Sequence, residues 1–237
     1  MSQRGTGLGE RGITGLETSI VLIAFVVVAS VFAFTVLSAG VFSSEAAKQT
    51  VLAGLKETRS RLRQNGSVFA FSAQTGTTPA VYKIVFNVSN SLAGEPLDLT
   101  ATYTSDATGL DPDFDSAAVP ATIISYADEH QRLADVPWSV NFIGNHNGDT
   151  LMEDGEKAEV TVWLMDRDNA VLETDPDAVQ PMDGDTGNGG GVGGIDTNGV
   201  LIGKSTRFVL EMTLEIGASL TIQRSVPPGL RRVMNLN

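Results

Sequence analysis

Cysteine is absent from the 237-residue sequence, and histidine occurs only twice, at His130 and His146. The absence of cysteine excludes a disulfide framework, a thiolate nucleophile and a cysteine metal site, and two histidines are too few for a histidine-rich metal cluster. Positive charge is also scarce, since 16 lysine and arginine residues stand against 28 aspartate and glutamate residues, a net charge of −12. A surface of that sign repels phosphate backbones. The composition therefore argues against nucleic acid as a partner.

The charged residues leave two interpretations of the source open. Arginine outnumbers lysine by 11 to 5, and the isoelectric point is about 4.5. Such a surface stays hydrated in concentrated salt, where screening removes the repulsion between like charges, and this indicates a halophilic source. An ordinary acidic extracellular protein is the alternative. The apolar fraction of 42% is normal for a chain that folds around a core, which excludes a wholly disordered protein.

Charge is missing altogether over the 27 residues from Thr18 to Ser44, and Ile20–Leu37 is almost continuously apolar. As a helix the charge-free segment would extend ~40 Å, enough to cross the hydrocarbon core of a bilayer. No turn residue interrupts the apolar run, so its length predicts a helix rather than strands. Arg4 and Arg11 precede it, and positive charge on that side keeps the N-terminus in the cytoplasm. A secretory signal cleaved near 38–40 is the alternative, but the run is long for such a signal.

The residues in front of the apolar run carry a motif. Arg11-Gly12 is followed by Ile13-Thr14-Gly15-Leu16-Glu17, an order that resembles a class III, prepilin-type signal. The stretch ITGLETSIVLIAFVVVASVFAFTVLSAGVFSSE resembles the N-terminus of archaellins, the archaeal flagellins. This resemblance implies that a prepilin-type signal peptidase removes residues 1–12 by cutting between Gly12 and Ile13. The apolar helix would then stay in the mature subunit.

Glu17 would become the fifth residue after that cleavage, a position where the pilin superfamily often carries a glutamate. A lone carboxylate at the head of an apolar helix is costly in hydrocarbon, so it tends to find a partner. The new N-terminal amine at Ile13 of a neighbouring subunit would serve as that partner and make Glu17 an assembly residue. Alternatively, Glu17 lies among lipid headgroups and stabilises the helix N-terminus.

We expect the helix to continue beyond the apolar run, over residues 13–65. Its second part is amphipathic, with an apolar stripe formed by Val51, Leu52, Leu55 and Leu62. A separate helix capped at Ser43 or Ser44 is the alternative, and Asn65-Gly66 is expected to end the helix. A rod of ~75 Å is too long for one domain of this size to bury along its length. Residues 13–65 are therefore predicted to form the core of a filament made with other copies.

From Thr77 onward the apolar period changes to two, which predicts strands separated by turn residues. The alternating segments are 82–88, 97–103, 136–142, 160–164, 208–216 and 220–222. Because no helix-length segment interrupts them, we expect an α+β protein: a long N-terminal hydrophobic helix followed by an all-β, immunoglobulin-like sandwich. Residues 66–76 are expected to be a linker and 77–237 the outer sandwich domain, with Trp138 and Trp163 among its core or inter-strand aromatics. The segment 182–199, with eight glycines in 18 residues, is expected to be a flexible surface loop.

The segment 145–156 has the oxygen spacing of a calcium-type loop. Hard cations take several oxygen ligands from a short turn, and such ligands stand here at Asn145, Asn147, Asp149, Glu153 and Glu156. Two departures weaken the match, because asparagine begins the loop where aspartate is usual and Thr150 occupies the glycine position. No cofactor is required by the rest of the sequence. A polar hairpin turn without an ion is the alternative to a Ca²⁺ site.

Two N-glycosylation sequons follow the helix, Asn65-Gly66-Ser67 and Asn87-Val88-Ser89. Both fall on the exported side of the predicted membrane segment. Asn87 shares a strand face with Lys83, opposite Phe86, and is expected to point outward. Archaellins are commonly glycosylated, which the family resemblance implies and the sequons alone do not.

The resemblance implies a structural subunit of the archaellum, the archaeal swimming filament, that polymerises with identical or paralogous archaellins. The expected partners are the signal peptidase, the membrane before assembly, and the archaellum export and motor machinery; the mature protein would lie outside the cell. A type IV adhesion pilus subunit is one alternative, and a membrane-anchored binding module or a surface enzyme on a β-sandwich are others. No nucleophile has an evident partner, and both histidines are expected at the surface, so we expect no enzymatic activity and no catalytic residues.

Overall fold

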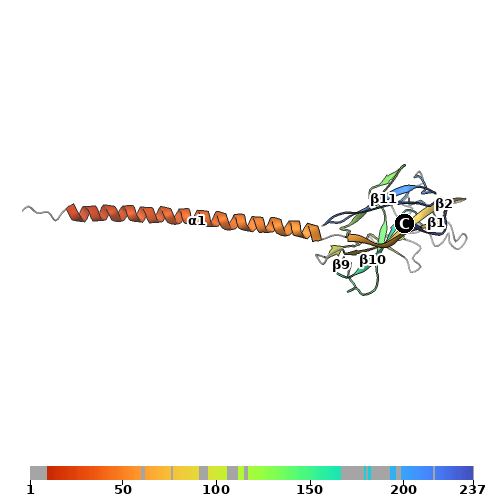
Figure 1. Ribbon diagram of the computed structural model, residues 1–237, viewed down its shortest axis with the longest axis horizontal. Coiled ribbons are helices and arrows are strands. Elements are labelled where there is room, and N and C mark those ends of the chain that lie inside the picture. Colours follow the sequence, from red (N-terminus) through yellow and green to blue (C-terminus); the bar gives the residue numbers. More distant parts are fainter. Residues whose placement is uncertain are drawn as a thin grey trace, which may run out of the picture. The chain divides into compact units, whose positions relative to one another are not determined.

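A computed structural model describes residues 10–59, 62–75, 77–90, 96–105, 112–114, 117–166, 179, 181–182, 193–195, 199–215 and 217–236. These residues form two units, one of residues 1–54 and one of residues 55–237. The first is dominated by a single helix and the second by antiparallel sheets (Figure 1). The α+β class predicted from the sequence is confirmed, whereas its immunoglobulin-like detail stays a prediction.

Helix α1 (Glu10–Arg59) runs without interruption for 50 residues (Figure 1). No break occurs at Ser43 or Ser44, so the alternative with a separate second helix is wrong. The helix begins three residues before Ile13, where we expected it to start, and ends at Arg59 rather than at Asn65. Continuous hydrogen bonding is possible because no proline interrupts the segment, and Gly40 and Gly54 are tolerated inside a helix at a cost of about 1 kcal/mol each relative to alanine.

The second unit is built from thirteen strands among the residues that the structure describes. They are β1 (Leu62–Thr75), β2 (Thr78–Asn90), β3 (Leu97–Asp98), β4 (Tyr103–Ser105), β5 (Pro112–Phe114), β6 (Ile123–Asp128), β7 (Arg132–Leu133), β8 (Trp138–Phe142), β9 (Leu151–Met152), β10 (Lys157–Trp163), β11 (Arg207–Thr213), β12 (Leu220–Ser225) and β13 (Val233–Leu236). The two larger sheets have the orders β13-β1-β2-β10-β8 and β12-β11-β6-β7. Two small ladders, β3-β9 and β4-β5, complete the pairing.

One hydrophobic core joins the two larger sheets. Ile84 and Phe86 of β2 lie in the same cluster as Phe208 and Leu210 of β11, and all four are at most 1% exposed. Both tryptophans are fully buried, and the Trp163 indole donates a hydrogen bond to Ser139 Oγ at 3.0 Å. The bond gives the indole N–H of the buried Trp163 ring a hydrogen-bond partner. The burial of Trp138 and Trp163 confirms that both are core aromatics.

The predicted linker over residues 66–76 is wrong, because most of it is strand β1. Asn65 and Gly66, expected to end the helix, lie inside that strand, where the pairing with β2 shifts register between Gln64 and Val68. Gly66 has φ = 92°, a conformation that glycine adopts without the steric cost other residues meet. The Asn-Gly pair is therefore a bulge within a strand.

The glycine-rich segment 182–199 is anchored in the core where the structure describes it. Met182 and Ile195 are buried, and the two residues are joined by a hydrogen bond from Met182 N to Ile195 O. Ile195 N in turn donates to Leu164 O at 2.8 Å. Met182, Gly194 and Ile195 are thus packed in the fold rather than part of the surface loop that we expected, while Gly193 is exposed. Most of the remaining residues of the segment lie outside the described ranges.

Candidate assembly surface

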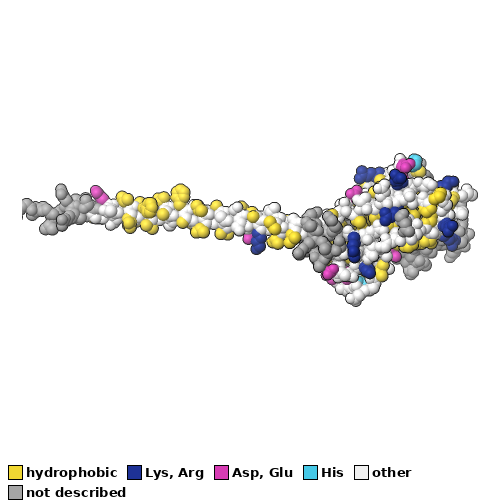
Figure 2. Space-filling view, viewed as in Figure 1, with side chains coloured by type: hydrophobic (Ala, Val, Ile, Leu, Met, Phe, Trp, Pro, Cys, Tyr) yellow, Lys and Arg dark blue, Asp and Glu magenta, His cyan; other side chains and the backbone are white. Residues whose placement is uncertain are grey.

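The most unusual surface of the chain is that of α1, which is apolar on all sides. Large side chains from Leu16 to Leu55 are between 44% and 78% exposed, including Phe25, Phe32, Phe34 and Phe42. Over Gly15–Leu55 the mean hydropathy reaches 3.0 in its most apolar window, and none of that window is buried. Figure 2 shows apolar side chains along the length of the helix. A helix that is apolar all round needs a membrane or other protein around it, so this surface is the candidate functional site.

Several hydroxyl groups on this surface are satisfied by the helix itself. Ser19 Oγ donates to Gly15 O at 2.8 Å, Ser30 Oγ to Val27 O at 2.8 Å, and Thr35 Oγ1 to Phe32 O at 2.9 Å. Because these polar atoms have partners within their own helix, they can enter an apolar environment without leaving a donor unpaired. The helix surface is therefore suited to a lipid bilayer and to a packed bundle alike.

The predicted cleavage and assembly residues lie at the start of this helix. The backbone of Gly12 and Ile13 is helical, while the side chain of Ile13 lies outside what the structure describes. Glu17 is exposed on the first turns of α1. Nothing in an isolated chain tests the processing or the contact of Glu17 with a neighbouring amine, so both stay predictions.

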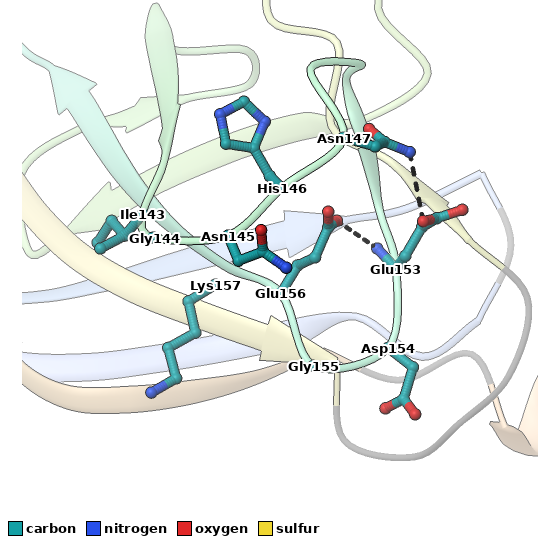
Figure 3. A pocket seen from close by; sticks show the side chains of 10 residues that line it. All are labelled: Ile143, Gly144, Asn145, His146, Asn147, Glu153, Asp154, Gly155, Glu156 and Lys157. Carbon is teal, nitrogen blue, oxygen red and sulfur yellow. Dashed lines mark hydrogen bonds between the residues drawn. The ribbon is translucent and has the colours of Figure 1, made fainter.

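The proposed calcium loop is a compact polar turn between β8 and β10. Asn147 Oδ1 accepts a hydrogen bond from Asp149 N at 3.0 Å, and Asp149 Oδ1 accepts one from Leu151 N at 3.0 Å. Asn147 Nδ2 also donates to Glu153 Oε2 at 3.3 Å, and Glu153 N donates to Glu156 Oε2 at 2.9 Å (Figure 3). These bonds hold the turn through its own side chains, as the hairpin alternative requires.

Residues of this turn also line an open hollow of about 710 Å³, from Ile143 to Asn147 and from Glu153 to Lys157. In Figure 3 the side chains of Asp154 and Lys157 point away from the loop. Among the residues that the structure describes, no group of three or more histidine, aspartate or glutamate side chains is placed to hold a metal ion. Calcium binding by Asn145, Asn147, Asp149, Glu153 and Glu156 stays a prediction.

The two sequons lie on neighbouring strands of the five-stranded sheet. Asn87 is half-buried on the central strand β2, because neighbouring strands flank it on both sides, and Ser89 Oγ accepts a hydrogen bond from Arg63 Nε at 3.1 Å. Asn65 is half-buried in the β1 bulge beside the exposed Gly66. Asn87 is less accessible than the outward position that we expected, and its glycosylation stays a prediction like that of Asn65.

A buried carboxylate fixes the end of β6 in the outer domain. Asp128, with a side chain 2% exposed, accepts hydrogen bonds from Tyr126 Oη at 2.8 Å, His130 N at 2.6 Å and Gln131 N at 2.9 Å. Burial alone would raise the pKa of Asp128, but these bonds favour the charged form and hold the pKa below its usual 3.8. Burial and the neighbouring carboxylate raise the pKa of Tyr126. The side chain of His130 is 60% exposed, which confirms its surface position.

Sequence reasoning missed two interactions that order the outer domain. Lys83 is 7% exposed, and its Nζ lies 4.8 Å from the ring centre of Trp163 and 5.0 Å from that of Phe71, a cation–π arrangement. Arg224 of β12 donates to Leu236 O and to Gln64 Oε1, and so joins the edges of the two larger sheets. The partners of Arg224 are up to 160 residues away in sequence, and no local pattern indicates them.

Comparison with known proteins places these features in context. The family model for archaeal-type flagellin matches residues 12–224. The chain is 30% identical over 231 residues to "Probable flagellin 1" of Archaeoglobus fulgidus, covering 96% of this chain and 95% of that protein. It is also 30% identical over 229 residues to "Probable flagellin 2" of the same organism, covering 92% and 91%. Among solved structures, the archaeal flagellum of Methanospirillum hungatei matches with a TM-score of 0.57 at 21% identity, covering 94% of this chain and 98% of that one, which supports the fold.

Proposed function

The chain belongs to the archaeal-type flagellin family, and we propose that this subunit of the archaellum filament assembles through helix α1. Its role is structural: it is a filament subunit for swimming motility and not an enzyme. The adhesion pilus and the anchored binding module are not favoured by this membership. The single observation that carries the proposed assembly is the exposure of large apolar side chains all round α1.

Assembly through α1 has a clear driving force. Burial of apolar surface stabilises by about 25 cal/mol per Å² removed from water, and α1 offers such surface on every side. Contacts that repeat from copy to copy without closing a ring generate a helical filament. In this arrangement α1 forms the core, and the β-domain forms the outer part.

The precursor lies in the membrane before it assembles. The charge-free segment Thr18–Ser44 spans the bilayer, and a prepilin-type signal peptidase cuts between Gly12 and Ile13 on the cytoplasmic side. Glu17 then contacts the amine of Ile13 in a neighbouring copy. Paralogous subunits share the filament, the archaellum export and motor machinery drives it, and Asn65 and Asn87 carry glycans in the outer domain.

The mature N-terminus tests this proposal most directly. Filaments sheared from the native cell and analysed by mass spectrometry are expected to contain a chain that begins at Ile13. A chain found intact in the membrane would not have been processed, and a chain cut near Gly40 would have lost most of the helix; either result would overturn the proposal. The same spectra report any added mass on the peptides that contain Asn65 and Asn87.

A further inference from the structure

The surface of α1 carries only three charged side chains between residues 15 and 55: Glu17, Glu45 and Lys48. Glu17 lies near the start of the helix, but the other two lie within the apolar surface. Val41 stands one turn before Glu45 and is 68% exposed, and Leu52 stands one turn after Lys48 and is 53% exposed. Figure 2 shows apolar side chains between the few charged ones on the helix. Residues three and four apart share a helix face, so neighbours that cover Val41 and Leu52 also cover the charged residues between them.

Covering Glu45 and Lys48 requires a partner for each. A charge moved out of water without a counter-charge is strongly unfavourable. Within the part of the chain that the structure describes, neither Glu45 nor Lys48 forms an ion pair or hydrogen bond through its side chain. Both groups remain available to a second copy of the chain.

We propose that Glu45 of one subunit pairs with Lys48 of a neighbouring subunit in the filament core. The inference rests on assembly through α1 and adds the residues that set the register between copies. Three residues of helix separate the two side chains by about 4.5 Å along the axis and roughly 60° around it. One helix can thus present its carboxylate to one neighbour and its ammonium group to another. Such a contact uses different patches on its two sides, and it propagates from copy to copy without closing.

Charge reversal tests the pair, with the critical concentration for polymerisation of the full-length mature chain as the readout. Glu45→Lys and Lys48→Glu are each expected to raise that concentration about 100-fold, because each leaves like charges together in an apolar contact. The double variant E45K/K48E is expected to return to within a few-fold of the wild type. The exposed outer-domain residues Lys204 and Glu211 provide matched controls, K204E and E211K, which are expected to polymerise normally.

A mixture of the two single variants separates a pair between copies from a pair within one helix. The E45K chain is positive at both positions and the K48E chain is negative at both, so opposite charges meet only between the two kinds of chain. The equimolar mixture is therefore expected to polymerise where each variant alone does not. Rescue by the double variant without rescue by the mixture would place the pair inside one helix and overturn the inference.

Two further outcomes are informative. Normal polymerisation of both single variants would also overturn the pairing of Glu45 with Lys48, because the charges would then not meet in the contact. Failure of the proposed function is distinguishable, because the wild-type chain would then form no polymer through α1 under any of these conditions.

Discussion

Removing one phenylalanine ring separates filament assembly from folding of the outer domain. Phe32 on α1 is 68% exposed and Phe86 in the sandwich core is 1% exposed, so the same substitution by alanine acts on two different processes. A phenylalanine side chain buries roughly 200 Å² of surface. Substitution of Phe32 by alanine removes about 100 Å² of the apolar surface that a neighbouring subunit could bury. At about 25 cal/mol per Å², Phe32→Ala weakens assembly by about 2.5 kcal/mol per subunit, or about 60-fold in critical concentration.

The core variant is expected to behave in the opposite way. Phe86→Ala removes a fully buried ring and leaves a cavity, which costs about 3–5 kcal/mol of unfolding free energy. That loss is a large part of the total stability of a typical domain. Phe32→Ala is expected to leave the unfolding free energy of the outer domain unchanged, because Phe32 belongs to the helical unit and its ring is exposed there.

The assay uses the full-length mature chain of each variant. Chemical denaturation in detergent, followed by the fluorescence of the buried Trp138 and Trp163, reports folding of the outer domain. Sedimentation after removal of detergent reports the critical concentration for polymerisation. A wild-type critical concentration for Phe32→Ala would refute the assignment of α1 as the assembly surface, and a lowered denaturation midpoint for Phe32→Ala would show that α1 belongs to the folding unit.

Three further changes test the outer domain. If residues 145–156 bind Ca²⁺, millimolar calcium raises the unfolding midpoint and a chelator reverses the gain; an unchanged midpoint leaves the polar-turn interpretation. The lowered pKa of Asp128 stabilises the fold above pH 3.8, and this contribution is lost as the pH falls through the folded-state pKa. In urea denaturation, Asp128→Asn is therefore expected to lose about 1.5–3 kcal/mol of unfolding free energy at pH 7, and its stability is expected to depend less on acid pH than that of the wild type. An equal acid dependence of the two proteins would contradict this. Gly194→Ala places a Cβ 2.8 Å from Leu164 O and is expected to lower the unfolding free energy by about 1–3 kcal/mol, whereas Gly229→Ala, which meets nothing within 4 Å, serves as the control that stays near the wild-type value.

The helix was predictable because its signal is local and long. A charge-free run from Thr18 to Ser44 exceeds any normal strand, so its length alone decided between helix and strand. The strand segments 82–88 and 160–164 were also visible, since apolar residues alternate along them, and they lie largely within β2 and β10. Periodicity is a property of neighbouring residues, and the structure confirmed these segments.

Strand β1 was not predictable in the same way. Its sequence LRQNGSVFAFSAQT alternates poorly, and Asn65-Gly66 resembles a helix stop when only neighbouring residues are considered. The strand is stabilised by pairing with two other strands. One is β2, the next strand in the sequence, and the other is β13 near the end of the chain, where Met234 lies opposite Ala70. Tertiary pairing of this kind overrides local preference.

The candidate site was partly predictable. Glu17 could be identified because a family pattern points to it, whereas Glu45 and Lys48 carry no motif and stand out only through the exposed Val41 and Leu52 on the same helix face. The contacts made by Arg224 and Lys83 depend on residues brought together by the sheets. Side-chain contacts between residues far apart in the sequence cannot be predicted from the local pattern of residue types.

The inward-turned hydroxyls of α1 have a mechanical consequence for a filament. Ser19, Ser30 and Thr35 use their hydrogen-bonding capacity on their own helix, so a neighbouring helix meets a surface with few directional bonds. Dispersion and apolar burial resist separation of the helices, but the hydrophobic effect is non-directional and gives few specific contacts between two helices. A filament core built from α1 would therefore be held together by apolar contact, while its register would depend on the few charged contacts and on the outer domains.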